Sequence, residues 1–190
     1  MKKSIGAGTI LYPNPVLIVG SYDSQGKANA MTVAWGGIAS SNPPSVAISL
    51  RKATYTHGNI TKRKAFTISI PSESQAKYAD YFGIKSGRNE DKFAVTGLTP
   101  VKSEIVDAPY VQEFPLILEC RLLHIFELGL HTQFVGEIMD VKVDEDMLDE
   151  GGKPDIKKIR PFFYDHSGFS YYGIGELLGK AYTIGKDISQ

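Results

Sequence analysis

The chain has 190 residues, and its 21 basic and 21 acidic side chains give a net charge of zero. A balanced charge argues against a nucleic-acid partner, because general polyanion binders carry an excess of basic residues. The length suits one domain with a substantial buried core. Residues 1–8 lack the apolar run of a secretion signal, and the apolar segment 16–19 is too short to span a bilayer. We therefore expect a cytoplasmic protein with no membrane partner.

The chain contains one cysteine, Cys120, and four dispersed histidines. A single cysteine excludes an internal disulfide and fits a reducing compartment. Cys120 lies in a run rich in leucine and isoleucine, which favours a small buried side chain over a redox thiol. The histidines form no compact ligand motif, so we expect no metal site. The sequence also lacks the glycine motif that opens a dinucleotide-binding Rossmann helix and the G-x-S-x-G elbow of a serine hydrolase.

Strand patterns dominate the chain, and Gly or Pro turns separate them. Alternating or continuous apolar runs predict strands over residues 15–22, 29–35, 45–51 and 65–70, and longer strands over 115–127 and 132–143. Turns are expected at 23–26 and 42–44, because glycine and proline interrupt a strand ladder. Many short strands with few helices predict a mainly β (α+β) fold, an antiparallel barrel with peripheral helices.

Two helices and one long loop are expected between these strands. Residues 56–64 predict a short helix capped by Thr56 and ending in basic residues, and residues 72–82 show apolar side chains at helical spacing. Residues 83–100 are polar and glycine-rich, which predicts a surface excursion of the kind that often carries function. The stretch 159–172 is rich in aromatic residues and supplies more apolar area than a tail normally keeps in water, so we expect dimerisation.

The stretch 29–56 has the character of a binding site. A strand of small and hydroxyl residues leads through a proline turn into a second strand, which ends in Arg51, Lys52, Thr54 and Thr56. These side chains and the free N–H groups of a following helix form a set of donors that suits a phosphate. An anionic, planar ligand such as FMN would fit this place. The alternative is a buried hairpin followed by a Thr-capped helix with a solvated basic end.

Four strings in this chain carry a family resemblance. They are N-A-M-T-V-A-W at 29–35, N-P-P-S-V-A-I-S-L-R-K-A-T-Y-T-H at 42–57, D-K-F-A-V-T-G-L at 91–98 and G-L-H-T-Q-F-V-G-E at 129–137. Their order and separation resemble the flavin reductase-like, FMN-binding split-barrel family, and within it the flavoredoxin-like branch. The resemblance implies one domain over residues 1–190, an antiparallel split barrel with Greek-key character, and FMN held without a covalent link in a groove at a homodimer interface.

The resemblance also assigns roles to individual residues. It places five residues of the first strand along the flavin ring and ribityl chain, four at the end of the next strand, and four at or beside the phosphate. These are Asn29, Met31, Thr32, Ala34 and Trp35; Ser49, Leu50, Arg51 and Lys52; and Thr54, Tyr55, Thr56 and Lys92. The alternatives are a core anchor for Trp35, a filler of core space for Met31 and a solvated loop charge for Lys92.

One triplet departs from the family pattern. Reductases of this family commonly carry Gly-Asp-His, a triplet associated with nicotinamide binding and hydride transfer, where this chain reads Gly129-Leu130-His131. His131 remains a candidate catalytic residue beside the flavin, and the alternative is a strand histidine bonded to backbone. We expect an FMN oxidoreductase that transfers electrons from a redox protein. The other expectations are a flavin reductase with NADH or NADPH as transient donor, and a flavin-binding module without turnover.

Overall fold

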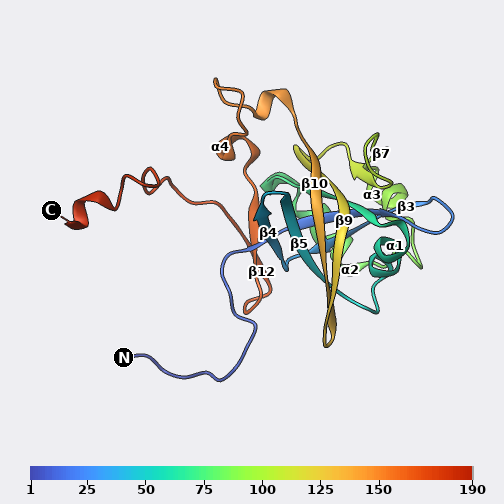
Figure 1. Ribbon diagram of the computed structural model, residues 1–190, viewed down its shortest axis with the longest axis horizontal. Coiled ribbons are helices and arrows are strands. Elements are labelled where there is room, and N and C mark those ends of the chain that lie inside the picture. The colour runs from blue at the N-terminus through green and yellow to red at the C-terminus, as the bar shows by residue number, and fades with distance from the viewer. Residues whose placement is uncertain (190) are drawn as a thin grey trace.

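The computed structural model describes residues 1–189, and a seven-stranded antiparallel sheet is the central element of that part of the chain (Figure 1). The spatial order of the strands is β3-β2-β6-β9-β10-β5-β4. Their bounds are β2 Leu17–Tyr22, β3 Ala28–Val33, β4 Gly36–Ser41, β5 Pro44–Arg51, β6 Ala65–Ile70, β9 Leu116–Leu128 and β10 His131–Val143.

The sheet must curl, because its two edge strands are neighbours in the sequence. Only Ala34 and Trp35 join β3 at one edge to β4 at the other. The backbone N–H of Ser49 in β5 also bonds the carbonyl oxygen of Trp35 at 2.9 Å. A connection of two residues keeps both edges together, so the sheet closes into a barrel that stays split beside Trp35. The predicted antiparallel split barrel is confirmed.

Two small sheets and four short α-helices surround the barrel. The sheets are β1 (Asn14–Pro15) with β11 (Phe162–Asp165) and β12 (Ser170–Gly173), and β7 (Pro100–Lys102) with β8 (Pro109–Val111). The helices within residues 1–189 are α1 Tyr55–Arg63, α2 Ala76–Ile84, α3 Lys92–Thr96 and α4 Ile156–Ile159, with 3₁₀ turns at Glu73–Gln75, Glu145–Met147 and Lys186–Ser189.

Alternating side chains of β2 serve two cores. Val19 packs inside the barrel with Phe66, Phe134 and Cys120. Ile18, the preceding residue, packs outside the barrel against α2 and α3. This division follows from the period of two in a strand, which sends successive side chains to opposite faces. Cys120 is fully buried, and burial raises the pKa of its thiol to about 12. The interpretation of Cys120 as a core residue is confirmed.

The structure differs from the sequence predictions at four places. Thr54, not Thr56, is the N-cap of α1, because the helix begins at Tyr55. The loop expected over 83–100 contains α3, which buries Phe93. Strand β4 was not predicted, because its sequence is G-G-I-A-S-S and shows no clear alternation. The aromatic stretch 159–172 folds as the β11–β12 hairpin and buries Phe162, so only part of its apolar area faces water.

The two ends of the chain extend away from the barrel as arms (Figure 1). Residues 1–13 are exposed along their whole length, and the chain beyond β12 also leaves the body of the protein. No helix within residues 1–189 is long and apolar enough to cross a membrane.

Candidate functional site

A continuous groove runs from the start of α1 to the split in the barrel. It consists of two adjoining cavities of about 490 and 480 Å³, a size typical of small-ligand sites. Met31, Arg51, Thr54 and Gly83 line both cavities, so these residues mark the place where the two join. The first cavity is named the phosphate end and the second the ring end, after the chemistry of their walls.

The phosphate end lies at the N-terminus of α1. Thr54 caps the helix: its hydroxyl accepts a hydrogen bond from the N–H of His57 at 3.4 Å and donates one to the carbonyl oxygen of Arg51 at 2.9 Å. The N–H groups of Tyr55 and Thr56 belong to the first helical turn and have no intrahelical acceptor. The Arg51 guanidinium forms no ion pair within residues 1–189. These donors are available to an anion.

Asn29 leaves a buried acceptor at this end of the groove. Its side chain is 5% exposed, and its Nδ2 donates to Thr56 Oγ1 at 2.9 Å. Its Oδ1 has no hydrogen-bond partner in the described part of the chain. Gly87 packs against this oxygen so closely that a Cβ there would lie 2.1 Å from it. A buried acceptor without a donor is costly, so this position fits a ligand that brings a hydroxyl or N–H group.

Lys92 lies in the wall of the phosphate end with its side chain only 3% exposed. Its ammonium donates hydrogen bonds to the carbonyl oxygens of Phe82 and Lys85, both at 3.2 Å, and so satisfies the C-terminus of α2. Burial lowers the pKa of Lys92 to about 8. The alternative of a solvated loop charge is wrong. A cation held in this way carries its charge at neutral pH beside the free helix N–H groups.

The loop of residues 85–91 forms one side of the phosphate end, and sequence reasoning did not assign its residues to the site. Lys85, Ser86, Gly87, Arg88 and Asn89 all line this cavity. The polar, glycine-rich sequence predicts a loop with functional character. The packing of Gly87 on Asn29 places this loop against the strand that carries the predicted ligand contacts.

Aromatic side chains from three separate segments gather at the ring end. The centroid of the Trp35 ring is 4.7 Å from that of His131 and 5.9 Å from that of His166. All three rings are half-buried and line the cavity with Met31. Leu130, beside them in the β9–β10 turn, is 62% exposed. This end offers flat and apolar surface, and His166 is the member that the sequence analysis missed.

The remaining predicted residues divide into three groups. Ala34 and Ser49 line the ring end. Thr32 and Leu50 line it too but are engaged in the fold, since the Thr32 hydroxyl donates to the carbonyl oxygen of Ala79 and Leu50 belongs to the barrel core. Lys52 lines neither cavity, because its ammonium pairs with Glu127.

The Lys52–Glu127 pair belongs to a polar chain behind the helix start. The Thr132 hydroxyl donates to Glu127 at 3.3 Å, and Nε2 of His57 lies 2.9 Å from the same hydroxyl oxygen. Because the Thr132 proton is directed to Glu127, His57 donates from Nε2. Burial lowers the pKa of His57, so this ring is neutral near pH 7. The chain of contacts ties the first turn of α1 to β10.

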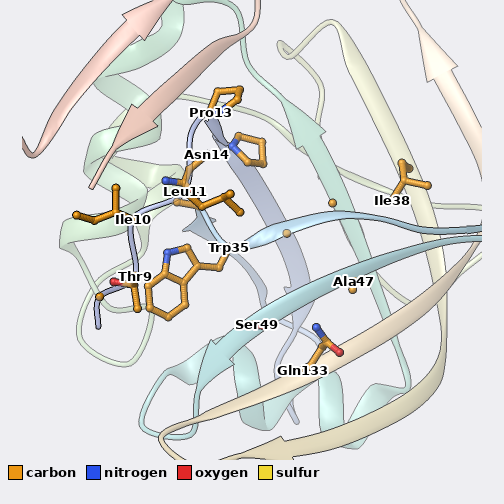
Figure 2. A pocket seen from close by; sticks show the side chains of 15 residues that line it. Thr9, Ile10, Leu11, Pro13, Asn14, Trp35, Ile38, Ala47, Ser49 and Gln133 are labelled. Carbon is orange, nitrogen blue, oxygen red and sulfur yellow. The ribbon is translucent and has the colours of Figure 1, made fainter. Parts of the chain in front are cut away.

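A third cavity of about 500 Å³ lies on the other side of Trp35 (Figure 2). The N-terminal arm covers it, and in Figure 2 the Trp35 indole lies beside Thr9 and Ile10. This cavity shares Ala34, Trp35 and Ser49 with the ring end. Trp35 is therefore a wall between two spaces and not a buried core anchor.

Comparison with known proteins gives one consistent result. The family model described as the flavin reductase-like domain matches residues 9–173. The structure superposes on flavoredoxin of Desulfovibrio vulgaris (Miyazaki F) with a TM-score of 0.93 and 57% identity, covering 98% of this chain and 100% of that chain. The structure also superposes on flavoredoxin from Methanosarcina acetivorans with a TM-score of 0.92 and 32% identity, covering 99% of each chain.

A third relative shows the same similarity at the level of sequence. An uncharacterized protein of Archaeoglobus fulgidus is 35% identical over 147 residues, which is 77% of this chain and 80% of that protein. The resemblance seen in the four sequence strings is thus confirmed. The chain belongs to the flavin reductase-like domain family.

Proposed function

We propose that this protein is an oxidoreductase of the flavoredoxin type, which binds FMN without a covalent link and transfers electrons through it. The observation that carries the proposal is the groove itself, with cations, hydroxyls and helix N–H groups at one end and half-buried rings at the other. FMN has the same division between a phosphate and a flat ring system. The high identity to a flavoredoxin over the full chain supports the same assignment.

The residues present fit FMN along its whole length. Arg51, Thr56, Lys92 and the first N–H groups of α1 would hold the phosphate. The unpaired Oδ1 of Asn29 would accept a hydrogen bond from a ribityl hydroxyl. Met31 and Trp35 would cover the ring and exclude water from it. When bound, the flavin supplies the redox chemistry, and the protein binds it, orients it and sets its electrostatic surroundings.

Leu130 favours a protein electron donor over a nicotinamide nucleotide. It presents an exposed apolar side chain at the ring end, where the reductase triplet has an aspartate. An apolar surface beside a partly open ring end suits docking of another protein, and it offers no carboxylate to bind a nicotinamide nucleotide. We propose His131 as the side chain that contacts the ring from the same turn, because it lies against Trp35.

The first experiment is a visible spectrum of the purified protein with FMN, followed anaerobically during reduction. We expect bound flavin that bleaches quickly with a reduced redox protein and slowly with NADH or NADPH. Fast bleaching with a nicotinamide nucleotide would favour the flavin reductase function. Bound flavin that no donor reduces would favour a binding module without turnover, and failure to bind any flavin would contradict the proposed function.

A homodimer is the second proposal. The C-terminal arm beyond β12 and the N-terminal arm both present large apolar side chains to water, which is unusual for a stable monomer. The exposed side chains include Ile5, Ile10, Leu11, Leu177, Leu178, Tyr182, Ile184 and Ile188. Sedimentation of the flavin-loaded protein should give a dimer, and truncation after Gly173 should weaken it. A monomer with flavin fully bound would contradict this proposal.

A further inference from the structure

A side-chain bridge crosses the phosphate end of the groove. Arg88, from the loop of residues 85–91, donates a hydrogen bond from Nη1 to the carbonyl oxygen of Ala53 at 2.7 Å. Ala53 belongs to the turn between β5 and α1, and both residues line the phosphate end. The bond therefore joins two separate segments of the cavity wall. It is charge-assisted, which makes it stronger than a bond between neutral groups.

An aromatic contact fixes the direction of the same side chain. The Arg88 guanidinium lies over the ring of Tyr55, with its carbon 5.5 Å from the ring centroid. The Tyr55 hydroxyl donates to Asp23 at 2.8 Å, and the same carboxylate accepts the backbone N–H groups of Gln25 and Lys27. Arg88 therefore rests on a ring whose far end is anchored in the β2–β3 turn.

The loop that carries Arg88 is itself held in place. The carbonyl oxygen of Ser86 accepts the N–H groups of Asn89 and Glu90 at 3.0 and 3.2 Å. The Glu90 carboxylate accepts a hydrogen bond from the Tyr81 hydroxyl at 2.6 Å. Gly87 packs directly on Asn29. The backbone of the loop is thus fixed on the barrel, and the exposed Arg88 side chain is the part that can move aside.

We propose that the Arg88 bridge limits the length of flavin that the groove accepts and selects the mononucleotide FMN over the dinucleotide FAD. This inference rests on the proposed function. FMN ends at its phosphate, which under the proposed function would lie against the wall formed by Arg51, Thr56 and Lys92. FAD continues from that phosphate into a second phosphate and an adenosine, and we infer that this extension leaves the cavity on the side that the Arg88–Ala53 bond crosses. FAD binding therefore breaks the bond to Ala53, whereas FMN binding leaves it intact.

The test compares dissociation constants of FMN, FAD and riboflavin for the wild type, Arg88→Ala and Lys85→Ala, measured by quenching of flavin fluorescence. We expect Arg88→Ala to lower the ratio of the dissociation constant of FAD to that of FMN by about tenfold. The change should come chiefly from tighter FAD binding, because the exposed charge-assisted bond to Ala53 no longer has to break. Lys85→Ala is the matched control: it removes a cation from the same loop and keeps the bridge. It should weaken FMN and FAD alike.

Three outcomes would overturn the inference while leaving the proposed function intact. One is wild-type protein that binds FMN and FAD equally well. Another is an unchanged ratio in Arg88→Ala, or an equal change in Lys85→Ala. The third is an Arg88→Ala variant that loses FMN relative to riboflavin and gains nothing for FAD, which would make Arg88 a phosphate ligand. Wild-type protein that binds no flavin would reject the proposed function as well, so the two failures are distinguishable.

Discussion

At the phosphate end of the groove, the donors are fixed by contacts within the protein, whereas at the ring end three half-buried rings line an open split in the barrel. Thr54 caps the helix, Asn29 holds Thr56, and Lys92 is buried against the end of α2. Trp35, in contrast, has a cavity on each side. The donors proposed to hold the phosphate are therefore preorganised by the fold, while the rings proposed to contact the flavin border open space.

Removing a cation from the phosphate end should have the largest effect. Arg51→Ala should weaken FMN by about tenfold to a hundredfold, because a charge-assisted contact to phosphate is lost, and should change riboflavin by less than about twofold. Titration of the apoprotein with both ligands measures the difference. Lys52→Ala is the matched control, since this neighbouring cation lines neither cavity. Equal losses for FMN and riboflavin in Arg51→Ala would remove Arg51 from the phosphate end.

A change at the ring end should act on both ligands equally. Trp35→Leu should weaken FMN and riboflavin alike by about three- to tenfold, because an aromatic contact contributes roughly 0.5–1.5 kcal/mol beyond its buried area. The same titrations provide the measurement. Phe169→Leu serves as the control, because Phe169 is an exposed aromatic residue near His166 that lines neither cavity. A loss confined to FMN would place Trp35 at the phosphate instead of the ring.

The smallest expected effect is a pH dependence at the phosphate end. Burial lowers the pKa of Lys92 to about 8, and Glu90 opposes this shift. The ammonium therefore loses its proton as the pH rises through 8, while a phosphate monoester is already doubly charged because its second pKa is about 6. The preference for FMN over riboflavin should fall by roughly threefold between pH 7 and 9. In Lys92→Met the preference should be lower and independent of pH in this range; a persisting slope would exclude Lys92.

The lowered pKa of Lys92 affects folding in the opposite direction: raising the pH weakens the preference for FMN but increases this residue's contribution to the stability of the fold. The pKa of Lys92 is lower in the folded protein than its ordinary value of 10.5. Between pH 8 and 10.5 the unfolded chain therefore binds more protons at this residue, so its contribution to the free energy of unfolding rises with pH. Urea denaturation of the wild type and Lys92→Met at pH 7.5 and 10 separates this effect from ligand binding.

Local sequence patterns were enough to predict most of the strands and one part of the proposed site. Arg51, Thr54 and Thr56 lie within six residues at a strand end and a helix start, so chain connectivity alone brings them together. Even there the predicted N-cap, Thr56, lies two residues after the observed N-cap, Thr54. Both threonines are equally good capping residues, and only the backbone conformation distinguishes them. Strand β4 was not predicted, because its small residues at the sheet edge show no periodic alternation of apolar and polar side chains.

The sequence by itself determined the strand content, the buried role of Cys120, the cluster of cationic and hydroxyl side chains over residues 51–56 and, through its four strings, the family. The tertiary structure decided which residues from distant parts of the chain come into contact with these segments. It brought Trp35, His131 and His166 to one surface, buried Lys92 against α2 and set Arg88 across the groove. These contacts join residues far apart in the chain, and no local pattern encodes them, because they depend on how the curled sheet closes and on which loop packs over its edge.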